Sequence, residues 1–162
     1  MNYMHSKLSI KDILKMAVAP FLVFMLGYCL ENFVPIYQLL EWPNRVVHFL
    51  GGLSISVPIF IVLKWAKANK FISTSNKWFD FLLIVMSAMC VATFWEYYEY
   101  ASDKFFPGPY LSQPSVDDTM KDMIMGMLGS ISFVLGWYIS GFFKKAEKVV
   151  EVVKVKSKTK KS

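Results

Sequence analysis

Four long apolar stretches constrain the fold of this chain more than any other feature. They fall at residues 16–34, 46–66, 78–101 and 119–143. A bilayer core ~30 Å thick takes ~20 mainly apolar residues to cross as a helix, and each stretch is about that long. The connections between the stretches are too short to hold a soluble domain. The sequence therefore predicts an all-α, polytopic membrane protein, with residues 1–143 forming a bundle of four transmembrane helices.

The composition supports a membrane environment and argues against other classes of protein. Hydrophobic residues make up 55% of the 162 residues and charged residues 19%, whereas disordered chains are polar and rich in charge. Cys29 and Cys90 both lie in apolar stretches, so they indicate neither a disulfide framework nor a zinc site. No small-x-small cleavage motif follows the first stretch, and we expect it to be an uncleaved anchor helix.

The positive charge follows the pattern of a multi-pass protein of the cell membrane. Of the 18 lysine and arginine residues, 15 fall in the N-terminal segment, the second connection and residues 144–162. The other three are Arg45, Lys104 and Lys121. Short loops rich in lysine and arginine stay in the cytoplasm, so we expect both termini to be cytoplasmic. Because the net charge of +6 is confined to these flanking segments, it does not indicate a nucleic-acid partner.

Residues 144–162 form a basic tail with eight lysines, and we expect this cytoplasmic tail to be disordered. Each lysine near an anionic leaflet contributes ~1 kcal/mol of binding, so one interpretation is that the tail binds anionic lipid. The alternative is that it serves only as an orientation signal. The sequence leaves open whether the chain forms a homo-oligomer.

The carboxylates gather at the opposite, outer end of the predicted bundle. At 3.6 residues per turn, Glu96, Glu99 and Asp103 fall on one stripe of the third helix. Asp118 and Asp122 share one face of the fourth helix. Carboxylates on one stripe repel each other unless a cation or protons intervene. A carboxylate at mid-membrane costs ~2.5–3.5 kcal/mol on translocon scales, so burying them needs compensation by a cation, a proton or a basic partner.

The second helix brings Arg45 and His48 to the same end. An imidazole gains or loses a proton near neutral pH, so His48 could be a metal ligand or a general base. The alternative is a histidine hydrogen-bonded at the interface. Arg45 could hold a phosphate or carboxylate, or form a buried pair with Asp122. Asp118 could instead cap the fourth helix.

Glycines follow the polar residues along two of these faces. The pair at residues 51–52 shortly follows His48, and Gly129 and Gly136 continue the face of Asp122. Small residues let transmembrane helices approach closely, so the sequence predicts a tight seam beside the polar cluster.

These patterns predict an outward-facing cluster with three sets of roles. We assign catalytic roles to His48, Glu96 and Asp122, and substrate-binding roles to Arg45, Glu99 and Asp118. The predicted ligands of a divalent metal are His48, Glu96, Glu99, Asp118 and Asp122. Hard oxygen ligands with one imidazole suit Mg²⁺, Mn²⁺ or Zn²⁺, and the depth of the site suits a lipid-linked or headgroup substrate.

Two other functions remain open at this stage. In a non-catalytic membrane assembly or stress factor, the polar cluster would be a structural network that specifies helix packing. A small proton-coupled transporter is less well supported, because the cytoplasmic half carries few acidic residues to complete a path. Whether the chain is an enzyme is undecided by sequence.

Three motifs carry a family resemblance: Arg45-x-x-His48-Phe-x-Gly-Gly, Trp95-Glu96-x-x-Glu99-Tyr and Asp118-Thr-x-x-Asp122-Met. Together they resemble the YjdF-type family of uncharacterised bacterial and archaeal inner-membrane proteins. More distantly they are similar to VanZ-like proteins, which place a histidine, a glutamate and aspartates at like points of a short helical bundle. The resemblance covers residues 44–136, with Asn44 where an acid is expected. It implies the architecture and the residue set, and it leaves the reaction open.

Overall fold

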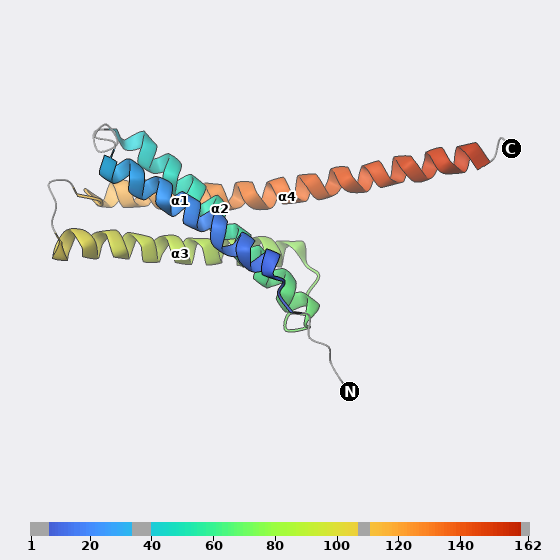
Figure 1. Cartoon of the computed structure of the whole chain (residues 1–162), viewed down its shortest axis with the longest axis horizontal. Coiled ribbons are helices and arrows are strands. Elements are labelled where there is room, and N and C mark those ends of the chain that lie inside the picture. The colour runs from blue at the N-terminus through green and yellow to red at the C-terminus, as the bar shows by residue number, and fades with distance from the viewer. Residues whose placement is uncertain (1–6, 34–39, 107–110, 160–162) are drawn as a thin grey trace.

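The computed structural model describes residues 7–33, 40–106 and 111–159, which form four α-helices (Figure 1). The helices are α1 (Ile10–Phe33), α2 (Glu41–Ala68), α3 (Lys77–Phe105) and α4 (Val116–Thr159). Each contains a segment long and apolar enough to cross a membrane. The described residues contain no strand. The predicted all-helical class with four spans is therefore confirmed, and it implies a lipid bilayer environment.

Exposed apolar side chains cover the helices, as a lipid environment requires. No residue in the apolar window of α1 is buried, and its large side chains include Phe21, 59% exposed, and Leu22, 60% exposed. Pro20 lies inside α1 and Pro58 inside α2. A proline has no N–H to donate to the preceding turn, and membrane helices tolerate it because neighbouring groups satisfy the freed carbonyl.

Local capping explains where two helices begin. Before α1, the N–H of Asp12 donates to Ser9 Oγ (3.1 Å), and the N–H of Ser9 donates to Asp12 Oδ2 (3.3 Å). This reciprocal pair resembles a capping box. Before α3, the side chain of Asn76 accepts the N–H of Trp78, which satisfies one of the donors left over at a helix start.

The helices form two oblique pairs. Figure 1 shows α1 lying along α2, with this pair crossing α3 and α4. α2 packs against each of the other three helices. At one end of the bundle α1 and α3 finish while α2 and α4 begin; we call this the cluster end. At the opposite, terminal end α1 and α3 begin, and α4 runs on beyond the bundle.

Small residues bring α2 and α4 into backbone contact. A Cβ atom added at Gly52 would lie 1.8 Å from the carbonyl oxygen of Gly126, and one at Gly129 would lie 1.9 Å from that of Phe49. The predicted tight seam is present at these positions. It does not extend to Gly136, where an added Cβ would meet no atom within 4 Å, because α2 and α4 are by then held apart by larger side chains such as Phe60 and Trp137.

The seam also contains a buried polar contact. The hydroxyl groups of Ser56 and Ser130 lie 2.8 Å apart, and neither residue is exposed. The Ser56 hydroxyl also donates to the carbonyl oxygen of Gly52 (2.7 Å). Hydrogen bonds between membrane helices contribute modestly to stability, and this one fixes the register in which α2 meets α4.

The terminal end has a packed core and paired charges. Leu63, Ile84 and Val134 are each at most 4% exposed and belong to one cluster. Beside them, Lys67 Nζ lies 2.5 Å from Asp80 Oδ1. These contacts join α2 to α3 and bring α4 against both.

Helix bounds differ from the expected ones chiefly at the chain ends. α1 begins at Ile10 rather than at residue 16, and α4 continues through Thr159 rather than ending near 143. Residues 144–159 of the tail that we expected to be disordered therefore form helix in this structure. The sequence after Gly141 contains no glycine or proline, so the usual signals for ending a helix are missing there.

Candidate functional site

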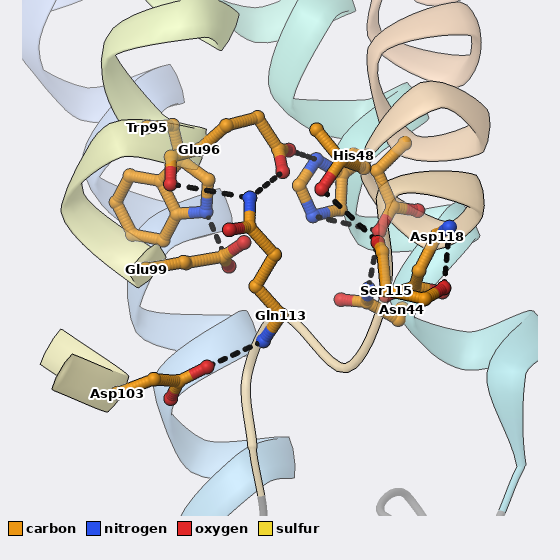
Figure 2. A network of polar contacts seen from close by, with 11 residues as sticks. Asn44, His48, Trp95, Glu96, Glu99, Asp103, Gln113, Ser115 and Asp118 are labelled. Carbon is orange, nitrogen blue, oxygen red and sulfur yellow. Dashed lines mark hydrogen bonds and ion pairs between the residues drawn. The ribbon is translucent and has the colours of Figure 1, made fainter. Parts of the chain in front are cut away.

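Three side chains at the cluster end converge as a potential cation site. His48 from α2 and Glu96 and Glu99 from α3 each offer one ligand atom, and these atoms all lie within 4.8 Å of one another. The side chains of His48 and Glu96 are 8% and 5% exposed. Figure 2 shows His48 and Glu96 pointing toward each other across the helices. Among the described residues, these three of the five predicted metal ligands form a group in which every ligand atom lies this close to the others.

His48 also connects α3 to α4. Its Nδ1 atom lies 3.7 Å from Glu96 Oε1, and its Nε2 atom lies 3.8 Å from Asp122 Oδ2. Both distances exceed the ~2.7–3.2 Å of an N–H···O hydrogen bond. The three groups assigned catalytic roles therefore stand side by side, with the imidazole between two carboxylates.

Two carboxylate oxygens in this cluster are buried without a hydrogen-bond partner in the described part of the chain. They are Glu96 Oε1 and Asp122 Oδ1, and the two residues are 4% and 1% exposed. Leaving a buried acceptor unsatisfied costs about 1–3 kcal/mol, and more if it is charged. A cation or a proton beside these two oxygens would remove that cost.

Neutral donors hold the other oxygens of these acids. Asn44 Nδ2 donates to Asp122 Oδ2 (2.7 Å), and Gln113 Nε2 donates to Glu96 Oε2 (3.1 Å). The indole Nε1 of Trp95 donates to Glu99 Oε1 (2.7 Å). Figure 2 shows Trp95 and Gln113 beside Glu96 and Glu99. Donors of this kind orient ligands around a metal.

Sequence reasoning missed all three donors. The spacing of Trp95 and Glu99 by four residues on one helix was a usable signal. The family resemblance marks Asn44 only as a departure from its pattern and indicates no role for this side chain as a donor. Gln113 lies in the connection before α4, and no periodic pattern indicates which side chain of such a loop reaches the site.

Asp103 anchors this connection and does not join the cluster. It accepts the backbone N–H groups of Ser112 (2.9 Å) and Gln113 (2.8 Å). Although Asp103 lies on the predicted acidic stripe, it stands more than a turn beyond Glu99 on α3. Asp103 positions the loop before α4. The same loop carries Gln113, whose side chain donates a hydrogen bond to Glu96.

The start of α4 also differs from expectation. The backbone N–H of Asp118 donates to Ser115 Oγ (3.1 Å), so Ser115 rather than Asp118 caps the helix. Asp117 forms an ion pair with Lys121 one turn later. Of the predicted substrate-binding residues, Asp118 lines the same cavity as His48 and Glu99, and Arg45 lies on α2 one turn before His48.

A cavity adjoins the cluster. Its volume is about 460 Å³, within the ~300–1,000 Å³ typical of small-molecule sites. Its polar lining includes Asn44, His48, Glu99 and Asp118. The remaining lining comes from all four helices and the connection before α4. The cluster therefore has both buried ligand atoms and neighbouring space for a substrate.

Comparison with known proteins agrees with the fold. The sequence model of a family described as "Predicted membrane protein (DUF2238)" matches residues 3–141. A protein of Thermotoga maritima, described as an uncharacterized protein, is 26% identical over 136 residues, covering 78% of this chain. The chain spans 64% of that relative's length. No solved structure matches the chain.

Proposed function

The chain belongs to DUF2238, a family of predicted membrane proteins, and we propose that its cluster binds a divalent cation inside the membrane domain. The observation that carries this proposal is the convergence of His48, Glu96 and Glu99 to within 4.8 Å. The buried, unsatisfied Oε1 atom of Glu96 supports it, because a cation would supply the missing partner.

The geometry needs a modest adjustment to hold a metal. Bonds of ~2.0–2.2 Å at a tetrahedral metal place two ligand atoms about 3.3–3.6 Å apart, so ligand atoms that now lie up to 4.8 Å apart would close by about 1 Å on binding. If Nδ1 of His48 binds the metal beside Glu96, Nε2 faces Asp122. A carboxylate on the second nitrogen is the usual arrangement for a metal-bound histidine.

The cation would serve chemistry on a lipid-linked or headgroup substrate. A bound Mg²⁺, Mn²⁺ or Zn²⁺ polarises a carbonyl or phosphoryl oxygen. His48, Glu96 and Asp122 would then hold or transfer protons beside the adjoining cavity. Arg45, Glu99 and Asp118 would contact the substrate. The buried position of the cluster within the four spans supports a substrate that reaches the site from the bilayer.

The second candidate is a structural network in a non-catalytic membrane assembly or stress factor. It is favoured by the three hydrogen bonds from Asn44, Trp95 and Gln113, which satisfy one oxygen on each acid. The transporter alternative gains no support, because the acids near the terminal end whose side chains the structure describes are bound by other groups, Asp12 by Ser9 and Asp80 by Lys67.

Charge pattern and motifs support further proposals about this chain. The lysine and arginine distribution favours cytoplasmic termini in the cell membrane, which would place the cluster end outside. The basic tail would bind anionic lipid on the cytoplasmic side. The three motifs favour kinship with YjdF-type and, more distantly, VanZ-like proteins. A homo-oligomer is a further option that gel filtration with light scattering would test.

Calorimetric titration of the purified chain with Mn²⁺ or Zn²⁺ in detergent tests the cation proposal. We expect binding by the wild type and its loss in Glu96→Gln, which keeps the side-chain shape and removes the charge. Asp80→Asn is the matched control, an acid-to-amide change at the terminal end that should bind like the wild type. A wild type that binds no cation, or equal binding by Glu96→Gln, would favour the structural network.

A further inference from the structure

The cavity beside the cluster has two chemically different parts. On α1 it is lined by Pro20, Val23, Phe24, Gly27 and Tyr28. Their spacing of three and four residues puts them on one helical face. A matching face of α3 runs from Ala88 to Ser102 and closes the other side. The part near Val23 and Ala88 is apolar, whereas the part near the cluster end contains carboxylates and hydroxyls.

The length of the cavity matches one leaflet of a bilayer. Fourteen residues separate Ala88 from Ser102 along α3, which at ~1.5 Å per residue is about 21 Å. Half of a hydrocarbon core is about 15 Å thick, so the cavity-lining residues of α3 extend over the depth of one leaflet. Its volume of about 460 Å³ leaves room for one chain rather than for a whole lipid.

The cavity lies where two helices stand apart. α1 packs against α2, and in the described part of the chain no Cα atom of α1 comes within 8 Å of one in α3. The gap is bridged by the rings of Phe24 and Trp95, whose centroids lie 5.8 Å apart in an edge-to-face contact. Because α1 and α3 both present exposed apolar surface, an acyl chain can reach this space from the bilayer by moving the two rings.

The polar part of the cavity favours a positively charged headgroup. Glu99 and Asp118 line it together with the aromatic side chains of Tyr28, Trp95 and Tyr98. Carboxylates and aromatic faces both attract an ammonium ion. The adjoining Glu96 carboxylate is 5% exposed and has a buried oxygen without a hydrogen-bond partner in the described residues. An anionic headgroup would face repulsion from these acids.

We propose that the cavity binds a phospholipid with an ammonium headgroup, such as phosphatidylethanolamine, with the ammonium group at Glu99 and Asp118 and one acyl chain between α1 and α3. This inference names the substrate class of the proposed function. That the bound lipid is a substrate rests on the proposed function. The lipid contact itself needs no metal, because Asp118 lines the cavity outside the group formed by His48, Glu96 and Glu99 and attracts the ammonium group directly.

Native mass spectrometry of the purified full chain in detergent tests this assignment. The protein is mixed with equal amounts of phosphatidylethanolamine and phosphatidylglycerol carrying identical acyl chains, with either EDTA or Mn²⁺ present. We expect retention of phosphatidylethanolamine to exceed that of phosphatidylglycerol about tenfold, corresponding to ~1.4 kcal/mol. In EDTA, where no cation is held by Glu99, Glu99→Gln should reduce this preference.

A matched pair of variants tests the place of the acyl chain. Val91 lines the cavity and is 44% exposed, whereas Val62 on α2 is 42% exposed and does not line it. Val91→Phe should lower phosphatidylethanolamine retention several-fold, and Val62→Phe should leave it unchanged. Folding of both variants is checked by their melting temperatures.

The outcomes separate this inference from the cation proposal. Equal or stronger retention of phosphatidylglycerol in EDTA would overturn the headgroup assignment, and wild-type retention by Val91→Phe would overturn the chain placement. Selective phosphatidylethanolamine binding by a protein that binds no cation in calorimetry would support the lipid site and refute the cation. Cation binding without selectivity for phosphatidylethanolamine would support the cation proposal and refute the lipid site.

Discussion

The two ends of the bundle use charged residues in opposite ways. At the terminal end, Lys67 and Asp80 form a close ion pair, and the Tyr138 hydroxyl donates to the carbonyl oxygen of Lys77 (2.8 Å). At the cluster end, Glu96 and Asp122 are more deeply buried, and each has an oxygen without a hydrogen-bond partner in the described residues. Proteins break the rules of polar burial mainly where function requires it. The comparison shows one end with paired charges and the other with buried, incompletely bonded acids, and the proposed ligand would complete the second.

The α2–α4 seam connects the two ends, and breaking it should have the largest effect. Gly52→Ala would place a Cβ 1.8 Å from the Gly126 carbonyl oxygen, and overpacking of this kind costs about 1–3 kcal/mol or more. We expect a clear fall in melting temperature and loss of cation binding. Gly51→Ala is the control, because an added Cβ there meets no atom within 4 Å. Equal stability of the two variants would contradict the close approach of α2 and α4.

The same substitution at the two ends should change stability in opposite directions. Without added cation, Asp122→Asn should stabilise the protein by about 1–3 kcal/mol, because it removes the negative charge of a buried carboxylate that lacks a full set of hydrogen bonds. Asp80→Asn should destabilise it by up to about 1 kcal/mol, because its ion pair with Lys67 is partly exposed. Chemical denaturation in detergent measures both. A loss of stability in Asp122→Asn would indicate that the cluster is a structural network.

Removing a donor around the ligands should have a smaller, specific effect. Trp95→Phe keeps an aromatic ring beside Phe24 and loses the N–H that donates to Glu99. Loss of such an orienting partner typically weakens metal binding ~10–100-fold, and we expect the lower end of that range in a Mn²⁺ titration. Trp78→Phe at the terminal end, where Trp78 is 73% exposed, should bind like the wild type.

The smallest expected effect is on the loop before α4. Asp103→Asn weakens two hydrogen bonds from backbone N–H groups at a cost of about 1 kcal/mol. Hydrogen exchange should become faster at Ser112 and Gln113, while the melting temperature changes little. Unchanged exchange at these two amides would show that Asp103 does not hold the loop.

Part of this site could be predicted from the sequence because helical periodicity carries it. The apolar stretches place four helices, and the stripes put Glu96 and Asp122 on faces that turn inward at the same end as His48. Periodicity shows which residues share a helix face, but not where the close approach of α2 and α4 ends. This explains why Gly136 was expected at the seam. Periodicity also does not describe loops, so the contact of Gln113 with Glu96 depends on tertiary structure alone.

Pulsed electron paramagnetic resonance of bound Mn²⁺ tests the central claim most directly, because it detects a coordinating imidazole nitrogen. The chain has two histidines, His5 and His48, so His5→Ala leaves His48 as the single imidazole. We predict nitrogen coupling to Mn²⁺ in His5→Ala and none in His48→Ala. Absence of nitrogen coupling in the first variant, or its persistence in the second, would contradict a cation held by His48 beside Glu96 and Glu99.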